Sequence, residues 1–125
     1  MQAPDGVTYP CCDRPWVDEY ARRLRPAMRV YRRGGRLLWL TLPVPRHRFR
    51  VPIFHAVNVA IVEAARTVGG VRVLRMDRLF SPHGYRSVMR YRGRDVRVRE
   101  PDGIHLNVAG TQIAASVVAK ALRGR

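Results

Sequence analysis

The strongest constraint on the fold is a pattern that occurs twice in the sequence. A segment with apolar residues at helical spacing ends at a glycine pair, and a short apolar run follows directly. Glycines commonly end helices, and apolar runs of this length suit strands. The order helix, strand, helix, strand is typical of an α/β protein whose parallel strands are joined by right-handed crossovers. The four segments are residues 16–33, 36–42, 53–68 and 71–77.

Local residues sharpen this pattern. Pro26 lies inside the first expected helix and should kink or divide it. The run over 36–42 is almost continuously apolar, which predicts a strand buried on both faces of a parallel sheet. A third helix is expected over 108–122, with Asn107 as its N-cap. The arginine-rich stretch over 91–100 is expected to be a polar loop.

The charge of the chain is strongly basic. Its 125 residues include 24 Lys+Arg against 9 Asp+Glu, a formal net charge of +15, and every basic residue except Lys120 is arginine. The planar arginine fork suits phosphate and carboxylate groups. The arginines are spread through every segment, however, and no RNP-like motif, zinc finger or phosphate loop accompanies them. Drift toward arginine is therefore favoured over nucleic-acid binding. The alternative is a basic module that binds nucleic acid or another polyanion through residues 46–50 and 86–99.

Other residue types exclude several classes of protein. The longest strongly apolar stretch, 37–44, is far shorter than the roughly 20 residues that cross a bilayer, so no membrane span is expected. The chain also lacks a signal-peptide pattern, and its compartment stays open. Cys11 and Cys12 are adjacent and cannot join distant segments, so we expect free thiols rather than a strained vicinal disulfide. The four histidines show no metal-ligand spacing, and we expect neither a metal nor a cofactor.

One pair of residues carries recognisable chemistry. Asp102 and His105 are three residues apart, just before the last expected helix. A carboxylate that accepts a hydrogen bond from one imidazole nitrogen leaves the other nitrogen free to take a proton from a serine hydroxyl. An Asp and a His on one short turn could both face a nucleophile brought from elsewhere. The same spacing also arises by chance, with Asp102 starting a turn and His105 as a surface or cap residue.

The stretch from Asp102 through Gly110, followed by an alanine-rich helix, resembles the last sequence block of the SGNH (GDSL-type) hydrolases. The resemblance implies that Asp102 and His105 are the catalytic aspartate and histidine. Residues 38–43 look like the fourth strand of that family with its proline exit, and residues 73–77 look like its fifth strand. The resemblance therefore covers most of the chain.

This resemblance implies a partial three-layer α/β/α fold of the flavodoxin-like type, with parallel strands and the first strands missing. The family's Gly-Asp-Ser nucleophile and its glycine and asparagine oxyanion-hole blocks have no counterpart, since Ser81, Ser87 and Ser116 are not preceded by Gly-Asp. We therefore expect one domain over 1–125 that corresponds to the C-terminal portion of such a hydrolase and begins with an irregular loop over 1–15.

The expected function is that of an SGNH-like ester hydrolase or acyltransferase fragment that keeps Asp102 and His105 and is inactive alone. Acyl transfer needs an activated nucleophile and oxyanion donors, and both are missing. A small ester is the expected substrate only if a missing N-terminal half completes the site. The bare sheet edge predicts self-association, pairing with a partner that carries the first three strands, or poor folding. A third interpretation is a noncatalytic interaction domain on the same fold.

Overall fold

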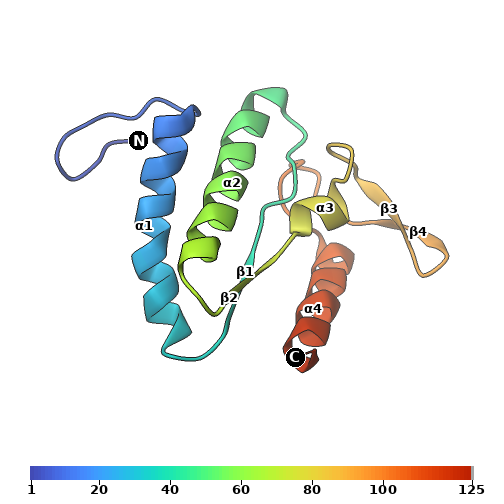
Figure 1. Ribbon diagram of the computed structural model, residues 1–125. Coiled ribbons are helices and arrows are strands. Elements are labelled where there is room, and N and C mark those ends of the chain that lie inside the picture. The colour runs from blue at the N-terminus through green and yellow to red at the C-terminus, as the bar shows by residue number, and fades with distance from the viewer. Residues whose placement is uncertain (125) are drawn as a thin grey trace.

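The computed structural model describes residues 1–124, which form four α-helices, one short 3-10 helix and four strands (Figure 1). The helices are α1 (Arg14–Arg32), α2 (Val51–Thr67), α3 (Met76–Phe80), α4 (Val108–Arg123) and the 3-10 helix η1 (Arg48–Arg50). The strands are β1 (Leu37–Leu40), β2 (Val71–Leu74), β3 (Val88–Tyr91) and β4 (Arg94–Arg97). Within residues 1–124, each helix is too short or too polar to cross a membrane.

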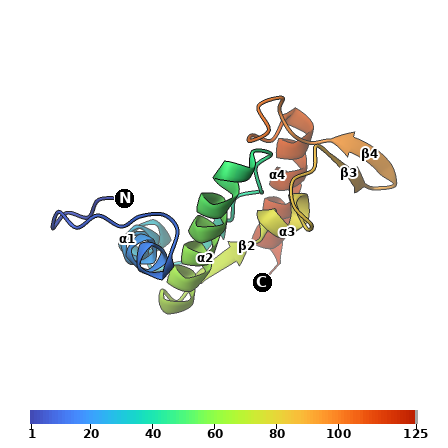
Figure 2. The ribbon, with the colours of Figure 1, turned by 90° about the horizontal axis from the view of Figure 1, so that it is seen from above.

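Strands β1 and β2 form a parallel two-stranded sheet in which Leu37 pairs with Val71. Helices α1 and α2 lie side by side on one face of this sheet, and α4 lies on the opposite face (Figures 1 and 2). The side chains of β1 alternate accordingly, because Leu37 and Trp39 pack on the α1–α2 side and Leu38 packs on the α4 side. This is the partial three-layer α/β/α arrangement that the sequence predicts.

Helix α1 begins where the side chain of Asp13 accepts a hydrogen bond from the backbone N–H of Trp16 at 3.2 Å. It ends at Arg33, which adopts a left-handed conformation just before the glycine pair. Pro26 lies inside the helix on its exposed side. Of the two expected effects of Pro26, a kink or a division, the division does not occur, because residues on both sides of the proline pack against α2 and hold one continuous helix.

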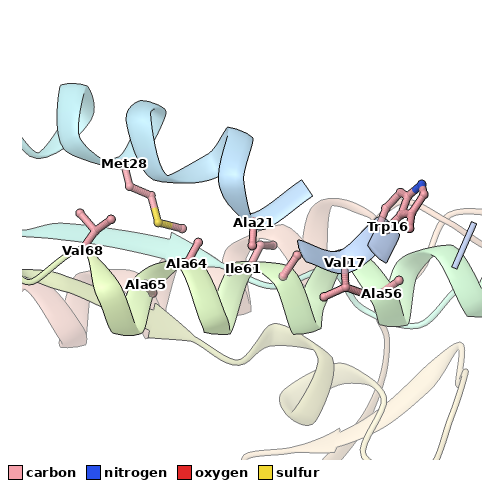
Figure 3. Close-up of a cluster of buried hydrophobic side chains, with 10 residues drawn as sticks. Trp16, Val17, Ala21, Met28, Ala56, Ile61, Ala64, Ala65 and Val68 are labelled. Carbon is pink, nitrogen blue, oxygen red and sulfur yellow. The ribbon is translucent and has the colours of Figure 1, made fainter. Parts of the chain in front are cut away.

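Helices α1 and α2 pack through small side chains. Ala21 on α1 and both Ala60 and Ala64 on α2 are fully buried, which lets the two backbones approach closely. Met28 is also fully buried and extends from α1 toward α2 near Ala64 and Val68 (Figure 3). Burial of a side chain of this size contributes about 1.5–3 kcal/mol. The α1–α2 contact is therefore the main apolar support of that face of the sheet.

A second apolar cluster lies on the opposite face, where β2, α3, the β3–β4 hairpin and α4 meet. Its buried members are Leu74, Met76, Phe80, Met89, Val98 and Ile113. Strand β1 is only half-buried between the two clusters, and Leu40 is 37% exposed. The expectation of a first strand buried on both faces is therefore wrong, because a sheet of two strands is too narrow for the helices to cover completely.

The segment after β2 also differs from expectation. The strand expected over 71–77 ends at Leu74, and α3 follows. The stretch 91–100, expected to be a loop, contains β4, which pairs with β3 in an antiparallel hairpin. The hairpin turns at Arg92 and Gly93, whose φ values of 49° and 78° are those of a tight two-residue turn. Arginine at the first of these positions makes the turn hard to predict from the sequence, since Asn, Asp or Gly usually stands there.

Before α1, the chain runs irregularly apart from a single bridge between Gln2 and Thr8. Tyr9 packs against the α1–α2 cluster, so this segment adds to that side of the molecule. Cys11 and Cys12 are joined by a disulfide, and the expectation of free thiols is wrong. Because the bond joins neighbours in sequence, it still ties no distant segments together.

Candidate active site

The loop between β4 and α4 holds Asp102 and His105. The backbone N–H of Gly103 donates to the carbonyl of Glu100 at 3.1 Å, and the N–H of Glu100 donates to the carbonyl of His105 at 2.8 Å. Gly103 has a φ of 70°, which an L side chain rarely adopts. The loop is therefore closed by its own backbone before α4 begins.

The start of α4 anchors this loop from its other side. Asn107 accepts a hydrogen bond from the N–H of Gly110 at 2.9 Å, which confirms its role as N-cap. Its amide also donates to the carbonyl of Arg97 at 2.9 Å, at the end of β4. A Cβ at Gly110 would lie 2.3 Å from the carbonyl oxygen of Val98, so only glycine allows this close approach.

Asp102 and His105 form a hydrogen-bonded pair. Oδ1 of Asp102 accepts from the backbone N–H groups of Ile104 and His105 at 2.8 and 3.0 Å. Its Oδ2 lies 2.5 Å from Nδ1 of His105. This contact assigns the imidazole proton to Nδ1 and leaves Nε2 as the proton acceptor. The imidazole is 74% exposed, so an external group can reach it.

The same contacts set the ionisation of the carboxyl group. The hydrogen bond from His105, followed by those from the N–H groups of Ile104 and His105, holds the pKa of Asp102 well below its usual range. Asp102 therefore stays a carboxylate throughout the neutral pH range. A fixed anion at Nδ1 orients the ring and stabilises the imidazolium that forms when Nε2 takes a proton.

Three hydrogen bonds, one of them between backbone groups and two from the Arg99 side chain, place this pair beyond the carboxyl end of β1. The N–H of Arg46, in the loop after β1, donates to the carbonyl of Gly103 at 2.9 Å. Nη2 of the buried Arg99 donates both to the carbonyl of Val44 at 2.9 Å and to that of Ile104 at 3.0 Å. Open α/β sheets bind ligands at this edge. The sequence gives no local signal for Arg99, which looks like any other arginine of the chain.

A second polar cluster lies at the same edge of the sheet. The Thr41 hydroxyl lies 2.5 Å from a carboxylate oxygen of Asp77, which also pairs with Arg75 at 2.6 Å. Burial raises the pKa of Asp77, but hydrogen bonds from Arg75 and Thr41 outweigh it and lower the net value. Asn58 on α2 bonds both the N–H and the carbonyl of Leu42 at 2.8 Å. Thr41, Arg75 and Asp77 thus bond one another, and Asn58 bonds the backbone, so that these groups hold the chain where it leaves β1 and β2.

The serines do not join the pair. Oγ of the buried Ser81 accepts from the N–H of Val44 at 3.0 Å, which is a structural contact. Ser116 donates to the carbonyl of Gln112 within α4. Among residues 1–124, the ring of His105 makes a side-chain hydrogen bond to Asp102 alone. The described residues can thus accept and return a proton, but they bring no nucleophile to His105.

Metal-ligating side chains do not gather either. Within the described part of the chain, no three His, Cys, Asp or Glu residues converge in a way that could hold a metal ion.

Fold and site together define an α/β protein with an exposed Asp–His pair at the carboxyl edge of a parallel sheet. The chain belongs to the family described as "Protein of unknown function (DUF459)", which matches residues 2–121. This family is associated with SGNH/GDSL-like proteins of the hydrolase type. No curated protein matches the chain.

Proposed function

We propose that this chain carries the proton-transfer residues of an SGNH-type ester hydrolase or acyltransferase. The observation that supports this most is the 2.5 Å contact between Nδ1 of His105 and Oδ2 of Asp102, on a ring whose other nitrogen is accessible. The family association and the position of the pair at the carboxyl edge of the sheet support the same function.

In the proposed reaction, Nε2 of His105 takes the proton of a serine hydroxyl while the serine oxygen attacks the carbonyl carbon of an ester. The carbon–oxygen bond to the alcohol then breaks, and the imidazolium returns its proton to the leaving alcohol. Water, or a second alcohol in an acyltransferase, releases the acyl group by the same steps. Asp102 remains ionised throughout and stabilises the imidazolium.

The serine and the oxyanion donors of this proposal come from a segment outside these 125 residues. None of the serines among residues 1–124 hydrogen-bonds the imidazole. The loss of one oxyanion donor typically costs about 10²-fold or more in rate. We therefore expect no appreciable ester hydrolysis by the isolated chain.

The sheet offers a place for that segment. Within residues 1–124, β1 pairs with β2 alone and has no second neighbour. Leu40 in β1 and Leu42 just after it are each 37% exposed. An open strand edge of this kind accepts another strand. We propose that the strands carrying the nucleophile pair along β1 and that, without them, this edge makes the chain self-associate.

The decisive experiment compares two chains in steady-state hydrolysis of p-nitrophenyl acetate. The isolated 125-residue chain should show no turnover that depends on His105. A longer chain, translated from in-frame codons upstream of Met1 that encode a Gly-Asp-Ser segment, should hydrolyse the ester. His105→Ala should then lower kcat by about 10⁴-fold or more. His83→Ala, at another exposed histidine, should leave kcat unchanged.

Three results would contradict the proposal. The first is an upstream sequence without an in-frame nucleophile segment. The second is a longer chain that hydrolyses the ester equally well after His105→Ala. The third is His105-dependent turnover by the isolated chain, which would mean that a nucleophile lies within these residues.

A further inference from the structure

A cavity of about 410 Å³ lies beside the Asp102–His105 loop. Its lining includes Arg46, Tyr85, Arg97, Arg99, Glu100 and Pro101. Its volume falls within the range of small-molecule sites. Its charged lining is unbalanced, because three arginines meet one glutamate. The cavity therefore favours an anionic ligand.

Arg99 is the central feature of this lining. Its side chain is 98% buried, since only 2% of the residue is exposed, and its guanidinium lies over the ring of Tyr85 at 4.9 Å. Nη2 is occupied by the carbonyls of Val44 and Ile104. Its Nε and Nη1 are buried and have no hydrogen-bond partner among residues 1–124. Two donors of a buried cation are thus left without an acceptor.

A buried guanidinium normally has a carboxylate partner, because an unpaired buried charge is costly. Among residues 1–124, neither Arg99 nor the two neighbouring arginines, Arg46 and Arg97, has a carboxylate within ion-pair distance. Burial accordingly lowers the pKa of Arg99 from its ordinary value, while the charges of Tyr85 and Asp102 oppose that shift. An anion in the cavity would supply the compensating charge.

We propose that this cavity binds a small oxyanion, a carboxylate or phosphate group, through Arg99, Arg46 and Arg97. Arg99 also bonds the carbonyl of Ile104, the residue directly before His105. The cavity therefore borders the loop that holds the proton-transfer pair. The inference that this anion is part of the substrate rests on the proposed function. It narrows the substrate class to esters that carry a carboxylate or a phosphate near the scissile bond.

Anion binding can be measured without any catalytic activity. The 125-residue chain, labelled with ¹⁵N at arginine, is titrated with inorganic phosphate and with succinate at a fixed ionic strength of about 0.15 M. The Nε–H signal of Arg99 should shift and saturate with at least one of the two probes. The tighter probe tells whether the group is a phosphate or a carboxylate.

Variants at the two exposed arginines avoid the structural role of Arg99. Arg97→Gln and Arg46→Gln should each weaken binding by about 3- to 10-fold. Arg94→Gln is the matched control, because it removes the same charge from the same strand as Arg97 but does not line the cavity. It should change the affinity by less than about 2-fold. Circular dichroism checks that every variant is folded.

Two outcomes would overturn the anion site. In one, Arg94→Gln weakens binding as much as Arg97→Gln, which means diffuse attraction to a basic surface. In the other, both probes leave the Arg99 signal in place. The proposed catalytic function is tested separately, by the effect of His105→Ala on ester hydrolysis. His105→Ala should leave the phosphate and succinate affinities within about 2-fold, because the imidazole does not line the cavity.

Discussion

The two faces of the β1–β2 sheet are built differently. On one face, α2 contributes five buried residues to the cluster that it shares with α1, among them Ala60, Ile61 and Ala64. On the other face, α4 buries only Gly110 and Ile113, and short elements complete the cluster. Both the Asp102–His105 pair and the arginine-lined cavity lie on loops of this second face.

The first face therefore mainly supports the stability of the fold, and the second face carries the polar site. The first face is held by continuous contact between two long helices, which is hard to open locally. The second is held by directed hydrogen bonds between loops, such as those of Arg99 and Asn107. Loops on a rigid support are where binding and catalytic residues concentrate. Substitutions on the two faces should therefore affect different measurements.

The largest expected effect on stability is at the first face. Met28→Ala removes a fully buried side chain from the α1–α2 contact and should lower the free energy of unfolding by about 2–5 kcal/mol. Urea unfolding measures this loss. In the fraction that remains folded, the NMR signals of His105 should stay in place, because Met28 belongs to the α1–α2 cluster and the site lies beyond the other.

Two variants on α1 control this prediction. Val30→Ala, at a position that is 66% exposed, should change the free energy of unfolding by no more than about 0.5 kcal/mol. Met28→Leu keeps the volume and should cost less than about 1.5 kcal/mol. If Met28→Ala shifted the NMR signals of His105 in the folded protein, the stability of the first face and the structure of the site would not be independent.

A smaller loss of stability, with a larger effect on the site, is expected at Gly110. Gly110→Ala places a Cβ 2.3 Å from the carbonyl oxygen of Val98. That same oxygen accepts the N–H of Asn107, so the start of α4 and the loop before it must shift together. The cost should be about 1–3 kcal/mol, as for other overpacked positions. The His105 signals should move and the anion affinity should fall.

Gly69→Ala is the matched control for this substitution, since a Cβ there meets no atom within 4 Å and Gly69 does not have a positive φ. It should be neutral within about 0.5 kcal/mol and leave the site unchanged. Equal effects of the two substitutions on the His105 signals would argue against the role assigned to Gly110.

The features that the sequence predicts follow the same division. The helices and parallel strands depend on local periodicity and on glycine pairs, and these were predictable, as was the Asn107 cap. The length of β2 was overestimated because α3 continues its apolar character beyond Leu74. Arg92 concealed the hairpin, since arginine rarely takes the first position of such a turn.

The site could be predicted only where its residues are close in sequence. Asp102 and His105 are three residues apart, so one motif contains both, and their catalytic role stays a prediction. Arg46 and Arg99 meet through the fold, across a long stretch of chain, and arginines occur in every segment. No local pattern could single them out. Burial distinguishes Arg99 from the other arginines, and which arginine is buried depends on the tertiary structure.

The smallest effect is expected in the pH dependence of stability, and it compares one carboxylate from each side. Hydrogen bonds from Arg22 and then Arg23 lower the pKa of Glu19 on α1 to about 2, against an ordinary value of 4.5. The pKa of Asp102 is also lowered, from an ordinary 3.8. A pKa that is lower in the folded state stabilises the protein above the unfolded value, and this contribution is lost as the pH falls.

The free energy of unfolding should therefore decline as the pH falls from about 5 toward 2, and each carboxylate should account for part of the slope. Glu19→Gln and Asp102→Asn should each flatten the slope. Glu19→Gln should also lower the free energy of unfolding more without added NaCl than in 1 M NaCl. The partners of Glu19 are charged arginines, and salt screens their attraction. Asp102 is bonded in part by uncharged backbone N–H groups, so the effect of Asp102→Asn should depend less on salt.

Urea unfolding at pH 5, 3.5 and 2.5 with both salt concentrations measures these slopes. An Asp102→Asn chain with the wild-type slope would show that the hydrogen bonds around Asp102 do not persist in solution, and that result would also remove the main support for His105 as an oriented base.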